Sequence, residues 1–308
     1  MTANVFDQAA RYSVQSDPPG FLRWIVPGLP PALRFQGWLD TRTLPFPGTP
    51  DRTCDTVADL AEEDAETGRR WAIVNEFQTE PEPEKLDRLL EYLARLRRGL
   101  RFGPQRREKY QVVAALVNLT GPAQPETLEM ALPGLTAPSL RLQAAVRTLR
   151  SEDAAATLDQ IAAGETSRCL LCWISLMQGG GESAIIERWK DVAGEEPESA
   201  LRATYGAIVT LFAELTDCVP LWQSGLEGWN MRESTVVAEW KAEGRAEGIA
   251  QAKRSDLILV IGQKFGAAVP ADLAAAIEAQ ADIDVLSQWL AGAVAAESLD
   301  TFRAAISR

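Results

Sequence analysis

Residues 71–80 read WAIVNEFQTE, an apolar and β-prone run of the kind that forms a buried strand. Glu76 and Gln78 interrupt this run, and because strand residues two apart share a face, both point to the same side of the predicted sheet. A carboxylate on a core strand is costly unless it is paired, hydrogen-bonded or bound to a metal. The segment therefore predicts a central strand that also carries a polar site.

The preceding segment, CDTVADLA at residues 54–61, alternates in polarity and predicts an antiparallel partner strand. The polar stretch EEDAETGRR forms the turn between the two strands. With Leu60 opposite Trp71, the register places Asp55 directly opposite Glu76, with Cβ atoms about 5 Å apart. A slip of one residue would instead place the two carboxylates on opposite faces of the hairpin.

The surrounding segments predict a mixed α/β domain over residues 1–150. PEPEKLDRLLEYLARLRRGL carries a leucine stripe at helical spacing, and YQVVAALVNLTG at residues 110–121 is typical of a strand buried on both faces. A further strand is predicted within TLEMALPG, and LRLQAAVRTLR fits either a strand or a helix. The order strand, strand, helix, strand indicates a mixed sheet flanked by helices.

The second half of the chain is predicted to be helical. Residues 151–235 form a helical extension that opens with a serine cap and an acidic first turn. Residues 236–253 are polar and contain two glycines four apart, which indicates a helical connector of low stability. Residues 254–308 contain three or four short amphipathic segments and predict a small C-terminal helical bundle.

Composition limits the class of protein. The chain of 308 residues is 46% hydrophobic and 24% charged, as expected of a globular protein. It shows no apolar run near the roughly 18 residues of a membrane span and no signal-peptide pattern, so we expect a cytoplasmic protein without a membrane partner. The net charge of −12 argues against a generic nucleic-acid binder.

One stretch opposes that charge balance. Residues 95–109, RLRRGLRFGPQRREK, hold seven basic residues and one acid. The stretch is either a solvated helix end or a patch that contacts phosphates, and in the second case its helical arginines would bind DNA. These arginines are Arg95, Arg98 and Arg101.

The chain contains no histidine and four cysteines. Without imidazole, Ser-His-Asp and Cys-His catalysis and histidine-ligated zinc are excluded. Cys169 and Cys172 form a single CxxC within the apolar segment RCLLCWISLM, which predicts buried core thiols rather than a zinc site. No feature indicates a haem, flavin or nucleotide cofactor. The remaining chemistry uses carboxylates and a metal held by oxygen, which suits Mg²⁺ or Mn²⁺.

The predicted hairpin supplies such oxygen ligands. Asp55 and Glu76 repel each other when both are ionised, and a divalent cation between them would relieve that repulsion. A bound cation acidifies its water and stabilises charge on a phosphoryl oxygen. Gln78 could orient the attacking water or a phosphate, but it cannot supply positive charge.

Three segments together resemble a known superfamily. DRTCDTVADL, AIVNEFQTE and DRLLEYLARLRR are similar to the PD-(D/E)XK nuclease-like proteins, and within them to the branch of recombination-promoting nucleases and putative transposases. The resemblance covers residues 55 to about 97, and the KAEGRAEG connector and helical tail also look like the C-terminal part of such proteins. It implies a restriction-endonuclease-like fold and Mg²⁺-dependent hydrolysis of DNA phosphodiesters.

The resemblance also implies residue roles. Asp55 and Glu76 match the metal-binding acids, and Gln78, also in the catalytic set, stands where the wider superfamily has lysine. Arg88 and Tyr92 lie one helical turn apart and match the helix motif. The superfamily often adds an acid from its first helix, and Asp7 is the early candidate here. The exchange of lysine for Gln78 removes a cationic stabiliser of the transition state.

Alternatives remain for the site and for the function. Glu76 could belong to a structural ion pair with Arg88 or a neighbouring arginine, Arg88 and Tyr92 could pack on the helix surface, and Asp59 is expected at a strand end or turn. The first functional hypothesis is a metal-dependent DNA endonuclease, which as a homodimer could cut both strands. A nuclease that acts on RNA is a further alternative. The second is a catalytically inactive nuclease-fold relative that acts as a protein-interaction or assembly module.

Overall fold

The computed structural model of the protein describes residues 5–39, 55–62, 69–80, 82–102, 109–123, 125–131, 138–229, 236–266 and 269–306. The chain divides into two compact units. One comprises Phe6–Val237 and contains both the predicted α/β domain and the predicted helical extension. The other comprises Ala238–Arg308 together with Met1–Val5. Each unit is described separately.

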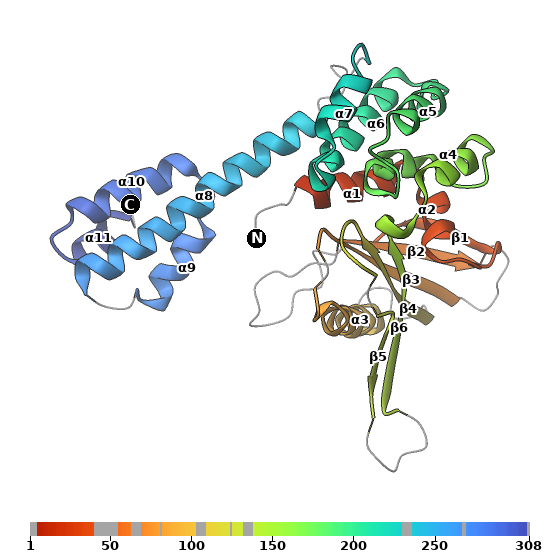
Figure 1. The fold of residues 1–308 in the computed structure, drawn as a ribbon. Helices are drawn as coiled ribbons and strands as arrows, with labels where there is room; N and C mark the ends of the chain where they lie inside the picture. Colours follow the sequence, from red (N-terminus) through yellow and green to blue (C-terminus); the bar gives the residue numbers. More distant parts are fainter. Residues whose placement is uncertain are drawn as a thin grey trace. The chain divides into compact units, whose positions relative to one another are not determined.

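A six-stranded mixed sheet forms the centre of the larger unit (Figure 1). Its strand order is β1-β2-β3-β4-β6-β5, with β3, β4 and β6 parallel and the other pairs antiparallel. The fold is therefore mixed α/β, as predicted, and the ambiguous segment LRLQAAVRT is a strand. The strands are β1 (Leu33–Trp38), β2 (Thr56–Glu62), β3 (Arg69–Gln78), β4 (Lys109–Asn118), β5 (Thr127–Met130) and β6 (Leu140–Thr148).

The hairpin between β2 and β3 has the predicted register. Leu60 pairs with Trp71, and Thr56 pairs with Asn75 at the other end of the ladder. This pairing places the residue before β2, Asp55, next to Glu76. Both faces of the two strands are buried, and a slip by one residue would turn Asp59 away from its partners Arg70 and Tyr110.

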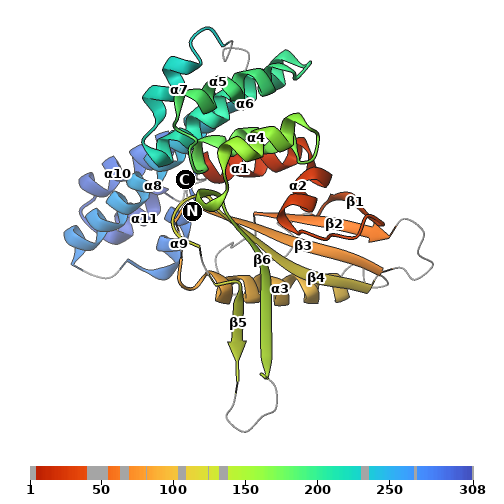
Figure 2. The same cartoon turned by 45° about the vertical axis from the view of Figure 1, so that its right-hand side comes forward.

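Helix α3 (Lys85–Phe102) covers one face of the sheet, and α1 (Val5–Ser16) and α2 (Pro18–Ile25) lie on the opposite face (Figure 2). The leucine stripe of α3 packs on small and branched strand residues in one apolar cluster. That cluster contains Val57, Ala72, Val74, Leu89, Tyr92, Leu96, Leu100, Ala114, Leu116, Leu142 and Ala144. The even positions of β3, which include Glu76 and Gln78, therefore face α3.

The opposite face of β3 packs on the helical extension. Phe77 lies against Phe21 and Trp173, with ring centroids 6.3 and 6.2 Å away. The extension is helical, as predicted. Its elements are η2 (Leu149–Ser151), α4 (Ala154–Ala162), η3 (Arg168–Leu176), α5 (Ser183–Gly194), α6 (Ser199–Phe212), η4 (Ala213–Thr216) and α7 (Val219–Gly225).

The CxxC cysteines lie in η3, where both are buried and free, so the prediction of core thiols is confirmed. Burial raises the pKa of Cys169, and it raises the pKa of Cys172 to about 12, so both thiols stay protonated at neutral pH. Cys54 lies outside the described residues.

The second unit is helical, as predicted for the C-terminal segment. It contains most of the 30-residue helix α8 (Val236–Phe265), then α9 (Ala271–Ala279), α10 (Ile283–Ala295) and α11 (Leu299–Ile306). Helix α8 continues without a break through residue 253, and the division of the chain into four segments stays a prediction. The core of this unit contains Leu257, Ile261, Leu273, Ile277, Ala293, Ala296 and Phe302.

Candidate active site at the carboxyl end of β3

Asp55 and Glu76 lie side by side where β3 nears its carboxyl end. The backbone N–H of Asp55 donates to Glu76 Oε1 at 2.9 Å, and the backbone N–H of Phe77 donates to Asp55 Oδ2 at 2.8 Å. Glu76 is only 4% exposed. These two reciprocal hydrogen bonds hold the Asp55 and Glu76 carboxylates next to each other, at the point where β2 begins and β3 nears its end.

Lys85 brings a positive charge to this pair from α3. Its ammonium donates to Glu76 Oε2 at 3.0 Å, and the residue is only 5% exposed. Lys85 is the first residue of α3, where the helix dipole disfavours a cation. Lys85 was not predicted from the sequence. A lysine in the first turn of a helix, where acidic residues are preferred, was a signal that could have identified it.

Helix α1, on the sheet face opposite α3, contributes a further cation to the cluster. Arg11 donates to Asp55 Oδ1, and Asp7 lies one helical turn before Arg11. Burial, followed by the negative charge of Asp55, raises the pKa of Asp7 to about 6, against the opposing effects of Arg11 and Lys85. Asp7 therefore lies within electrostatic range of Asp55. Arg11 was not predicted, and its i, i+4 spacing from Asp7 is too common in helices to mark a site.

The surroundings of Glu76 disfavour its ionised form. Burial, followed by the charge of Asp55, raises its pKa to about 7, and the ammonium of Lys85 only partly offsets these effects. Burial and then the charge of Glu76 also raise the pKa of Tyr92. The cluster therefore holds more negative charge than its two cations neutralise, which favours proton uptake or an added cation.

This imbalance predicts a specific pH dependence of stability. Glu76 binds a proton in the folded protein up to about pH 7 but only up to its ordinary value of 4.5 in the unfolded chain. Between these values the folded state binds more protons, so the free energy of unfolding falls as pH rises. The unfolding free energy of Glu76→Gln minus that of the wild type should therefore increase by on the order of 2–3 kcal/mol from about pH 5 to pH 7.5.

Urea unfolding of both proteins at the two pH values measures this gain. The comparison cancels the titration of groups that do not interact with Glu76, because the two chains differ only at that residue. A difference in unfolding free energy that is independent of pH would show that Glu76 keeps its ordinary pKa.

The donor set is suited to a hard divalent cation. Asp7, Asp55 and Glu76 offer carboxylate oxygens, the ligands that Mg²⁺ and Mn²⁺ prefer. Within the described part of the chain, however, no three acidic or cysteine side chains lie close enough together to hold a metal as they stand. Arg11 and Lys85 each take one oxygen. A cation would therefore replace contacts that these two residues make.

Gln78 follows Glu76 on the same face of β3. Its Nε2 donates to Asn118 Oδ1 on β4, and Asn118 Nδ2 donates to Thr148 Oγ1 on β6 at 2.9 Å. All three residues are buried. Asn118 and Thr148 were not predicted, because nothing in the sequence marks two polar residues at strand ends as neighbours of Gln78.

Two of the predicted helix residues lie near the cluster. Tyr92 is buried against the sheet, and its pKa responds to Glu76, Lys85 and Arg88. Arg88 is half-buried and forms an ion pair with Glu82. The ion-pair partner of Glu76 is therefore Lys85 and not Arg88, in contrast to the alternative that the sequence left open.

The basic residues further along α3 lie away from the cluster. Arg98 and Arg101 are exposed, at roughly 20 and 24 Å from Lys85 along the helix axis at 1.5 Å per residue. Arg95 is 9% exposed and forms an ion pair with Glu91. Its buried guanidinium is therefore poorly placed for DNA, whereas Arg98 and Arg101 can reach phosphates. Residues 103–108 of the basic stretch lie outside the described residues.

Asp59 differs from its expected place at a strand end or turn. It lies within β2, is 6% exposed, and accepts a hydrogen bond from Arg70 Nε at 3.0 Å and from the Tyr110 hydroxyl at 3.1 Å. The prediction was wrong because cross-strand partners satisfy this carboxylate inside the sheet. Asp59 is a paired, structural carboxylate on the same face as Asp55.

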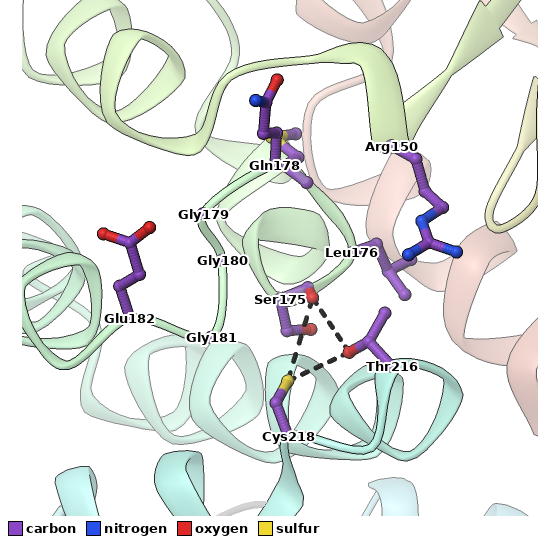
Figure 3. A pocket seen from close by; sticks show the side chains of 11 residues that line it. Arg150, Ser175, Leu176, Gln178, Gly179, Gly180, Gly181, Glu182, Thr216 and Cys218 are labelled. Carbon is purple, nitrogen blue, oxygen red and sulfur yellow. Dashed lines mark hydrogen bonds between the residues drawn. The ribbon is translucent and has the colours of Figure 1, made fainter.

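A separate hollow of about 340 Å³ lies in the helical extension (Figure 3). Its walls include Arg150, the loop Gly179–Gly181 and the pair Thr216 and Cys218. The Thr216 hydroxyl donates to the Ser175 carbonyl at 3.1 Å and lies 3.0 Å from Cys218 Sγ. These polar groups bond one another, and none of the sequence-predicted site residues lines the hollow. The carboxylate cluster is therefore the candidate site.

Comparisons with known proteins add no family to this description. No family model, curated protein or solved structure gives a significant match to the chain. Of the helices that the structure describes, none combines the length and the apolar character required to cross a bilayer.

Proposed function

We propose that the protein is a metal-dependent endonuclease that hydrolyses DNA phosphodiester bonds and has a restriction-endonuclease-like core. One observation carries this proposal: near the end of β3, the buried Glu76 carboxylate accepts hydrogen bonds from the Asp55 backbone and from the Lys85 ammonium. Clefts outside the carboxyl ends of parallel strands are common ligand sites in α/β sheets. The raised pKa values of Glu76 and Asp7 in such a place favour a functional site over a purely structural one.

The residues divide the chemistry between them. Asp55 and Glu76, with Asp7 as a third donor, would hold Mg²⁺ or Mn²⁺, which when bound supplies an acidified water and stabilises phosphoryl charge. Lys85 supplies the positive charge that Gln78 lacks, so it can stabilise the developing negative charge of the transition state. Arg98 and Arg101 would contact phosphates of the flanking DNA.

A second function is supported by a specific observation. All four oxygens of Asp55 and Glu76 already accept hydrogen bonds, two from backbone N–H groups and two from Arg11 and Lys85. A closed cluster of this kind is also what an inactive nuclease-fold relative, acting as an interaction or assembly module, would retain. Cation binding distinguishes the two functions.

Calorimetric titration with Mn²⁺ at about pH 7 provides the test, since metal binding displaces protons from its ligands. The wild type should bind Mn²⁺ with release of protons mainly from Glu76, so the measured heat should depend on the ionisation enthalpy of the buffer. Asp55→Asn should abolish this binding. Asp59→Asn is the matched control, because Asp59 is a buried carboxylate of the same strand face with its own cation, Arg70.

Either of two results would contradict the proposal. The first is the absence of Mn²⁺ and Mg²⁺ binding by the folded wild type, which would favour the interaction module. The second is equal loss of binding in Asp55→Asn and Asp59→Asn, which would indicate a structural effect and not a site.

A further inference from the structure

The three parallel strands end in a row of polar side chains. Gln78 pairs with Asn118 across β3 and β4, and Asn118 pairs with Thr148 across β4 and β6. The side chains are 3%, 0% and 7% exposed. One step further into the sheet on the same face, Leu116 and Val146 lie beside Glu76. The polar row therefore begins directly next to the carboxylate cluster.

The hydrogen bonds in this row have a direction. Thr148 Oγ1 accepts from Asn118 Nδ2, so Asn118 turns its Oδ1 towards Gln78 and accepts from Gln78 Nε2. A carboxamide carries its oxygen and nitrogen on opposite sides of the same carbon, and the Gln78 oxygen is therefore turned away from β4. The neighbour of β3 on that side is β2, which begins directly after Asp55.

We propose that Asn118 and Thr148 are positioning residues that hold the Gln78 carboxamide with its oxygen towards the Asp55 and Glu76 carboxylates. This inference rests on the proposed nuclease function. In this orientation the Gln78 oxygen can accept a hydrogen bond from the attacking water. That bond would direct the lone pair of the water oxygen towards the phosphorus. Gln78 is then no substitute for a lysine, and Lys85 supplies the cation.

The hydroxyl of Thr148 makes this role testable. A hydroxyl can accept or donate, so the row can also run in reverse, with Thr148 donating to Asn118 Oδ1 and Asn118 Nδ2 donating to residue 78. Gln78→Glu would use the reversed row and still present an oxygen to the cluster. Gln78→Lys keeps a donor to Asn118 but presents no acceptor.

The pair of Gln78 variants separates the two roles of this residue. Cleavage of plasmid DNA should be at least about tenfold faster for Gln78→Glu than for Gln78→Lys, since only the first preserves an acceptor. If Gln78 instead occupies the place of a lysine, Gln78→Lys should be the faster of the two, and that result would overturn the inference.

The pair Thr148→Val and Thr148→Ser tests the positioning itself. Valine matches threonine in shape but cannot hydrogen-bond, so kcat should fall by about ten- to a hundredfold with KM for DNA little changed, whereas serine should restore most of the loss. In NMR spectra with ¹⁵N-labelled glutamine, the side-chain amide signal of Gln78 should shift in Thr148→Val and stay in place in Thr148→Ser. Its absence from the spectrum of Gln78→Glu assigns this signal.

The outcomes separate this inference from the proposed function. Equal kcat values for the two Thr148 variants, or an amide signal that shifts in neither, would overturn the positioning role while wild-type cleavage stands. No cleavage by the folded wild type would overturn the proposed function and this inference with it.

Discussion

Glu76→Gln is expected to reduce the rate of DNA cleavage by at least about a thousandfold, since loss of a metal ligand removes several kcal/mol of transition-state stabilisation. Glutamine preserves the size of the side chain, and its single carbonyl oxygen can replace the acceptor for either Lys85 or the Asp55 N–H, which bond to different oxygens of Glu76. The variant therefore removes the negative charge while leaving the packing of the sheet in place. The initial rate of nicking of supercoiled plasmid at saturating Mg²⁺ measures the effect.

Lys85→Met should reduce the same rate by about a hundred- to a thousandfold, the usual cost of losing one preorganised group that stabilises transition-state charge. Methionine fills the buried stem but lacks the ammonium 3.0 Å from Glu76. The loss of Lys85 also removes an effect that lowers the pKa of Glu76. The rate of Lys85→Met should therefore rise with pH over a higher range than the wild-type rate, because Glu76 must be ionised to act.

A purely structural Lys85 would behave differently. Its loss would lower stability and move the pH–rate profile through Glu76, but the rate at a pH where Glu76 is fully ionised would equal that of the wild type. That result would contradict the assigned role. Lys85→Arg should recover part of the activity, because it keeps the charge but not the geometry of the ammonium. Arg101→Gln is the control on the same helix, and it should act mainly through KM for DNA and its salt dependence, because Arg101 is exposed far from the cluster.

The sequence predicted the hairpin, its register and the pair of carboxylates because all three depend on local patterns. The alternation in β2 and the apolar run in β3 favoured a register that pairs Val57 with Val74, although a slip by one residue stayed open. The structure has the favoured register, which brings Asp55 to Glu76. The leucine stripe of α3 was equally local. The segment LRLQAAVRT was ambiguous, because only its pairing with β4 and β5 makes it a strand.

The rest of the site depends on contacts between distant elements. Arg11 is 44 residues from Asp55, and Asn118 is 40 residues from Gln78 and 30 from Thr148. No periodicity relates such pairs, since packing of α1 on the sheet and the order of the parallel strands bring them together. Asp59 was misplaced partly for the same reason, because one of its two partners, Tyr110, lies on β4, whereas the other, Arg70, lies on the neighbouring strand of the hairpin.

The proposed activity is tested most directly by plasmid nicking with the wild type, Glu76→Gln and Asp59→Asn under identical conditions with Mg²⁺. We predict nicking by the wild type and Asp59→Asn that stops when Mg²⁺ is chelated, and nicking by folded Glu76→Gln that is at least about a thousandfold slower. Nicking by Glu76→Gln at a rate near that of the wild type, or no nicking by the folded wild type, would contradict the assignment of this cluster as a nuclease site.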